Sequence, residues 1–113
     1  MQNSVQIAFH GIDHSDAVET RIRDKVAKLE QFCDRITGCR VTVEMHHRNT
    51  SNLHHKGEPY HINIDISVPG EKIVVKRAPK DAHVHEDIGV ALRDAFSIAE
   101  RQLKDYTRKQ RGE

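Results

Sequence analysis

The basic residues of the C-terminal thirty positions recur at the spacing of one helix face. The set comprises Arg93, Arg101, Lys104, Arg108 and Arg111. An apolar set recurs every three or four positions on roughly the opposite face and comprises Ile88, Leu92, Ala95, Ala99, Leu103 and Tyr106. A helix with this pattern buries one side and projects a row of cations into solvent, which suits an extended polyanion.

Two other groups of basic residues accompany this row. Arg21, Lys25 and Lys28 lie along one flank of the apolar stripe of an earlier predicted helix. Lys72, Lys76, Arg77 and Lys80 form a second cluster at a predicted strand and the linker after it. That cluster either extends a nucleic-acid footprint or supplies edge-strand lysines that discourage sheet-to-sheet association. For the helix rows, an ordinary solvated surface is the alternative.

Histidines are concentrated between His46 and His85, where seven of the nine lie. His54, His55 and His61 are the candidate ligands for zinc or another transition metal. Their spacing is not diagnostic of a known site and no cysteine joins them, so we predict neither a metal nor a cofactor. The other hypotheses are histidines that contact RNA and histidines that decorate a polar loop.

Composition restricts the class of protein. A chain of 113 residues has room for one modest core, so we expect a single domain over residues 1–113. The formal net charge is only +1, so a local patch must meet any anionic partner. The sequence has no Gly-rich phosphate loop, nucleophile elbow or His-Glu-x-x-His motif, and we predict that it is not an enzyme.

The chain lacks both an apolar run of membrane-spanning length and a signal peptide, which favours a cytoplasmic protein. In a reducing compartment Cys33 and Cys39 are expected to remain thiols that fill the core.

Hydrophobic periodicity predicts an α+β fold with the order β-α-β-β-β-α. The predicted elements are a strand at 5–9, a helix from the N-cap Ser15 to about Phe32 or Asp34, strands at 39–45, 61–68 and 72–77, and a helix from about His85 to Lys109. Pro69-Gly70 is expected to be a hairpin turn, and residues 46–59 a loop or an irregular hairpin connection. One apolar face on the sheet and one apolar stripe on each helix predict two helices packed on one face of a four-stranded sheet.

With these elements placed, residues 25–36 (KVAKLEQFCDRI) and 101–104 (RQLK) resemble the ribosome hibernation-promoting factor family. Its members are also called ribosome-associated inhibitors or ribosomal subunit interface proteins. The resemblance extends over nearly the whole chain, including the acidic Glu86-Asp87-Ile88 entry to the last helix. It implies a fold similar to double-stranded RNA-binding domains and binding to 16S ribosomal RNA on the small subunit, where messenger and transfer RNA are excluded.

The chain departs from the family pattern in its last helix. Gly89 stands where the family usually has an aromatic residue, Arg93 where it has an acidic one, and Ile98 where lysine is frequent. The chain ends soon after this helix, so the resemblance is to a short form. It leaves open whether ribosome dimers are promoted or single ribosomes are silenced.

We therefore predict a translation inhibitor whose partners are the small ribosomal subunit and 16S RNA, with neither DNA nor a membrane expected and the oligomeric state left open. The resemblance points to Lys25, Lys28 and Arg101 as phosphate contacts. The full predicted RNA-binding set is Lys25, Lys28, Arg93, Arg101, Lys104, Arg108, Arg21, Lys76 and Arg77. The alternatives are a general double-stranded RNA-binding module and a metal-binding protein that uses the histidine loop.

Overall fold

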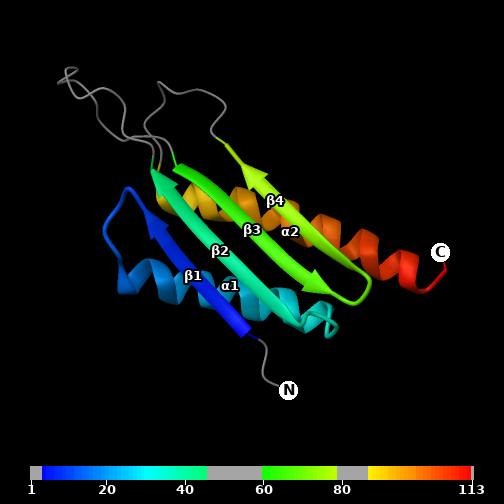
Figure 1. Cartoon of the computed structure of the whole chain (residues 1–113). Helices are drawn as coiled ribbons and strands as arrows, with labels where there is room; N and C mark the ends of the chain where they lie inside the picture. The colour runs from blue at the N-terminus through cyan, green and yellow to red at the C-terminus, as the bar shows by residue number, and fades with distance from the viewer. Residues whose placement is uncertain (1–3, 46–59, 79–86, 113) are drawn as a thin grey trace.

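Alternating apolar residues give the four-stranded sheet one face that must be covered, and two helices cover it (Figure 1). The computed structural model describes residues 4–45, 60–78 and 87–112. Its elements are β1 (Ser4–His10), α1 (Asp16–Phe32), β2 (Gly38–Met45), β3 (Tyr60–Val68), β4 (Glu71–Arg77) and α2 (Ile88–Gln110). This order confirms the predicted α+β fold, and every strand boundary agrees with the prediction within one residue.

The strands lie in the sheet in sequence order. β1 pairs parallel with β2, whereas β2–β3 and β3–β4 are antiparallel. A parallel pair needs a crossover between its strands, and α1 supplies it. The chain turns back between β3 and β4 at Pro69-Gly70, where Gly70 has a φ of 88° that favours glycine.

The core lies between the sheet and the helices. The β2 and β3 side chains that face the helices, such as Val41 and Ile64, are fully buried. Both cysteines are buried free thiols, as predicted. Burial, followed by the charges of Glu30 and Asp65, raises the pKa of the Cys39 thiol to about 12, so this side chain stays protonated in the core.

Short polar side chains define where the helices begin. Ser15 caps α1, as predicted, by accepting a hydrogen bond from the Val18 N–H (3.3 Å). For α2 the predicted start at about His85 lies outside the described residues, and the helix begins at Ile88. Asp87 is extended and accepts a hydrogen bond from the Gly89 N–H (2.8 Å), which makes it the N-cap.

The apolar stripe of α2 is wider than predicted, because Ala91 and Phe96 are also buried, while Ile88 is only half-buried. Tyr106 near the end of the stripe is buried, and its hydroxyl donates to the Pro69 carbonyl oxygen (2.9 Å). This bond fixes the last turns of α2 against the β3–β4 hairpin. Neither described helix is long and apolar enough to cross a membrane.

Candidate nucleic-acid interface

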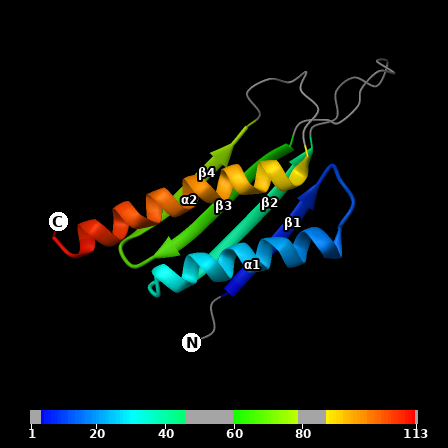
Figure 2. The same ribbon diagram turned by 180° about the vertical axis from the view of Figure 1, so that it is seen from behind.

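The two helices run in the same direction across the sheet, so their N-terminal ends lie together and their C-terminal ends lie together (Figure 2). Arg21 of α1 reaches the first turn of α2. Its Nη1 atom lies 2.6 Å from the point that a Cβ of residue 89 would occupy, and only the absence of that carbon at Gly89 makes room for it. Arg21 and Gly89 therefore mark the flanks by which the helices face each other.

Lys25 and Lys28 lie on the same flank of α1 as Arg21. They follow it by four and seven residues, which is the spacing of side chains that stack along one helix face. Lys28 is exposed and Lys25 is half-buried. The basic row of α1 therefore faces α2.

The basic row of α2 is turned toward α1 and solvent. With 3.6 residues per turn, Arg93, Lys104 and Arg111 lie within about 60° of Gly89 around the helix, while Arg101 and Arg108 lie about 100–120° from it. All five of these side chains are exposed. Together with Arg21, Lys25 and Lys28, they form what we call the interhelical basic surface.

Carboxylates are placed mostly on the other flank of α2. Asp94 and Asp105 lie about 140–160° from Gly89, on the side of β4. Glu100 is on the basic side and pairs with Lys104 (3.1 Å), and Arg108 pairs with Asp105 (3.5 Å). Such exposed pairs contribute little and give way readily to a stronger anion.

Most cations of the surface are available to a ligand. Six of its eight members have no carboxylate partner among the described residues, namely Arg21, Lys25, Lys28, Arg93, Arg101 and Arg111. A row of uncompensated cations on two rigid helices can hold phosphates at several successive positions of a nucleic-acid backbone.

The structure separates Lys76 and Arg77 from this surface. Arg77 donates to the Tyr60 carbonyl oxygen (3.1 Å) and pairs with Asp94 (3.2 Å), and its side chain is only 10% exposed. We therefore assign Arg77 a structural role. Lys76 is exposed and alternates with the buried Ile73 and Val75, so it lies on the open face of the sheet. Because β4 places successive side chains on opposite faces, Lys76 and Arg77 cannot belong to one surface.

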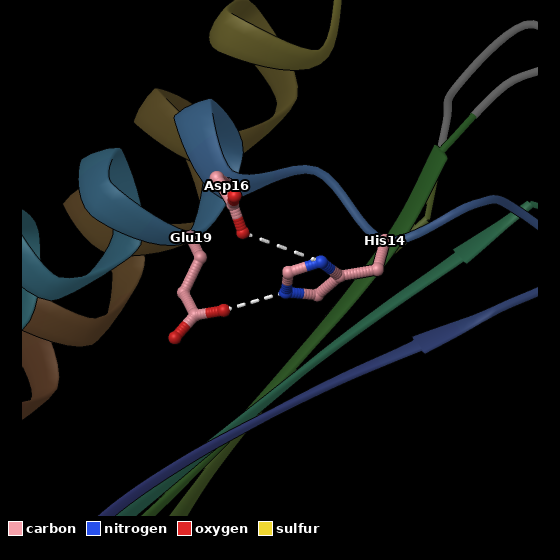
Figure 3. A group of neighbouring side chains, drawn as sticks. All are labelled: His14, Asp16 and Glu19. Atoms are coloured by element: carbon pink, nitrogen blue, oxygen red, sulfur yellow. Dashed lines mark hydrogen bonds and ion pairs between the residues drawn. The ribbon is translucent and has the colours of Figure 1, made fainter.

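The predicted metal ligands do not form a described site. His54 and His55 lie outside the described residues, and His61 pairs in register with Glu44 on the sheet. A different group, His14, Asp16 and Glu19, gathers at the start of α1 (Figure 3). This group was not predicted, although the sequence shows a histidine followed by an acidic first helical turn.

This group is better explained as an ion-pair cluster than as a metal centre. The two ring nitrogens of His14 face different carboxylates, with Nδ1 3.5 Å from Asp16 and Nε2 2.6 Å from Glu19. One ion cannot use both nitrogens of a ring. The hydrogen bond from His14, and then that from Arg23, lowers the pKa of Glu19, and the positive end of the helix dipole also favours anions here.

Comparison with known proteins identifies the family. Residues 5–111 match the family model described as Sigma 54 modulation protein / S30EA ribosomal protein. The chain belongs to this family. It is 28% identical over 101 residues to the ribosome hibernation promotion factor of Deinococcus radiodurans, an alignment that covers 89% of this chain and 47% of the relative. The chain thus spans about half the length of the curated relative it matches.

Solved structures related to the family share the fold. A ribosomal subunit interface protein from Coxiella burnetii superposes with a TM-score of 0.67 at 16% identity, over 92% of this chain and 97% of that one. The N-terminal domain of Protein Y from Thermus thermophilus gives 0.65 at 17% identity, over 93% and 99%. At these identities the likeness establishes the arrangement of sheet and helices and leaves the roles of individual side chains to be argued from this chain.

Proposed function

We propose that this chain is a ribosome-associated translation inhibitor that binds 16S RNA of the small subunit through its interhelical basic surface. The observation that carries the proposal is the convergence of two basic helix rows, marked by the contact of Arg21 with Gly89, in which six cations lack carboxylate partners within the described part of the chain. The name of the Deinococcus radiodurans relative supports a role in ribosome hibernation.

The surface suits folded RNA for a physical reason. Folded RNA is recognised largely through its backbone, its shape and its 2′-hydroxyl groups, which requires a rigid array of cations more than side chains that read bases. Each lysine or arginine that meets a phosphate releases condensed counterions, so affinity falls steeply as salt rises. Helices fixed on a sheet hold their cations in place before the RNA arrives, which reduces the entropic cost of binding.

The proposed mechanism is steric and involves no chemical step. The protein occupies the decoding region of the small subunit, so that messenger and transfer RNA are excluded while it is bound. This activity places the protein in the cytoplasm with the ribosomes.

Co-sedimentation with purified small subunits over a salt series tests the proposal. We expect saturable binding near one protein per subunit, with an affinity that falls as salt rises and that transfer RNA opposes. A free RNA duplex that removes the protein equally well would support a general double-stranded RNA-binding module instead. If neither subunits nor duplex RNA bind, the proposal is wrong.

A further inference from the structure

The helices leave a cleft between their C-terminal ends, opposite the end where Arg21 crosses to Gly89. Its volume is about 360 Å³. The walls include Gln31 in the last turn of α1, Asp34 and Arg35 just after it, and Thr107, Gln110 and Arg111 at the end of α2. Tyr106, which is buried and fixed by its hydroxyl, forms part of the floor.

The C-terminal cleft is lined both by cationic hydrogen-bond donors and by hydrogen-bond acceptors. Arg35 and Arg111 are exposed guanidinium groups, and neither has a carboxylate partner among the described residues. Gln31 and Gln110 each offer an amide that donates and accepts hydrogen bonds. On the accepting side stand the Asp34 carboxylate and the side-chain carbonyl oxygens of the two glutamines.

This combination selects against a simple anion. The C-terminal ends of both helices carry partial negative charge, and the Asp34 carboxylate adds to it. A ligand that satisfies the whole cleft must therefore present hydrogen-bond donors to these acceptors as well as negative charge to the two guanidinium groups. A nucleotide does both, because its base has donors on its edge and its phosphate is anionic.

We propose that the C-terminal cleft holds one unpaired nucleotide of the bound RNA, with its base between the helix ends and its phosphate on Arg35 and Arg111. The volume suits a single nucleotide, since it falls at the lower end of small-ligand sites. This inference rests on the proposed function, because the RNA backbone that lies on the interhelical basic surface would deliver the nucleotide. Unpaired nucleotides are the part of RNA whose base edges protein side chains can reach.

The cleft also makes the two ends of the interhelical basic surface different, so that a bound RNA has a preferred direction. At the N-terminal ends Arg21 reaches across to Gly89, so we expect that end to make backbone contacts only. At the C-terminal ends a base can enter between α1 and α2. An RNA that binds in one direction along the helices would therefore place its unpaired nucleotide at a fixed distance from its other phosphate contacts.

Two matched RNA hairpins test this inference with the whole chain. One hairpin carries a single-nucleotide bulge and the other is fully paired, and each is titrated against the wild type, Arg35→Gln, Arg111→Gln and Arg40→Gln. Arg40 is an exposed arginine on the open face of the sheet, so it controls for the loss of one charge. Backbone amide NMR shifts of Thr107 and Gln110 report whether the cleft is occupied.

We expect the wild type to prefer the bulged hairpin by about tenfold, equivalent to one or two added charge-assisted hydrogen bonds. Arg35→Gln and Arg111→Gln should each reduce that preference, whereas Arg40→Gln should retain it. Equal affinity for both hairpins without shifts at Thr107 and Gln110 would overturn the inference while small-subunit binding still supported the proposed function.

Free mononucleotides distinguish the two sources of this ligand. Titration with AMP, GMP, CMP and UMP should produce at most weak shifts at Thr107 and Gln110, because the cleft is open and the backbone contacts are missing. Saturating shifts with one mononucleotide, and none with the bulged hairpin, would contradict an RNA-borne ligand and identify a site for a free nucleotide.

Discussion

The cations on the two faces of this molecule have different charged neighbours. On the helix side, Lys25 and Lys28 of α1 face the basic row of α2, and carboxylates are mostly turned away. On the open face of the sheet, Arg40 stands opposite Asp65 in the strand register, and Glu44 stands between strands that carry His10 and His61. The comparison teaches that a surface for polyanions depends on where cations converge and what stands beside them, rather than on how many there are.

The largest expected effect comes from reversing charge on the helix side. Lys25→Glu with Lys28→Glu should weaken small-subunit binding by about tenfold to a hundredfold, because two phosphate contacts become repulsive. Lys72→Glu with Lys76→Glu makes the same change on the open face and should have a much smaller effect. Co-sedimentation at one fixed salt concentration compares the two pairs.

Both double variants should keep the wild-type circular dichroism spectrum and melting temperature within a few degrees, since Lys28, Lys72 and Lys76 are exposed. A larger loss from the Lys72 and Lys76 pair than from the Lys25 and Lys28 pair would place the RNA on the sheet and reverse the comparison.

The periodicity of apolar residues in strands and helices predicted most of the fold. The alternation around Ile64 and the spacing of Ile22, Val26 and Leu29 predicted which faces are buried, because burial of apolar area decides both. The predicted start of α2 at about His85 lies outside the described residues, and the N-cap at Asp87 depends on one hydrogen bond, from the Gly89 N–H to Asp87.

The candidate site was less accessible from the sequence. Periodicity assigned basic residues to helix flanks, but which flank of α1 faces α2 became clear only from the contact between Arg21 and Gly89. Arg77 appeared equivalent to Lys76 because both are basic residues of one strand. The separation arises from packing across the sheet edge, which brings Asp94 and the Tyr60 carbonyl to Arg77.

Arg77→Met sharpens the distinction between structural and ligand-binding arginines. Removing the guanidinium group deletes its hydrogen bond to the Tyr60 carbonyl and its ion pair with Asp94, so we expect the free energy of unfolding to fall by about 1–2 kcal/mol. Arg101→Met changes an exposed arginine and should stay within about 0.5 kcal/mol of the wild type. Urea denaturation measures both, and equal stability of the two variants would refute a structural role for Arg77.

Gly89→Ala probes the N-terminal contact between the helices. Alanine is favoured over glycine inside a helix by about 1 kcal/mol, but its Cβ would lie 2.6 Å from the Arg21 Nη1 atom, which must move. The substitution should therefore stabilise an Arg21→Ala background by up to about 1 kcal/mol and the wild type by less. A double-mutant cycle of urea denaturation measures the difference. Additive effects of the two substitutions would show that the contact between Arg21 and residue 89 has no interaction free energy.

The smallest expected effect concerns acid stability at the start of α1. Hydrogen bonds from His14 and then Arg23 hold the pKa of Glu19 below its ordinary value of 4.5. A carboxylate whose pKa is lower in the folded state stabilises the fold above its unfolded pKa, and this contribution is lost as pH falls through the folded pKa. Urea midpoints measured between about pH 3 and pH 6 should therefore fall less steeply with acid in Glu19→Gln than in the wild type.

Glu71→Gln, which changes an exposed carboxylate on β4, is the matched control, and its curve should run parallel to that of the wild type. Parallel curves for all three proteins would mean that the contacts of Glu19 with His14 and Arg23 contribute nothing to folding, and that the cluster in Figure 3 is only a surface arrangement.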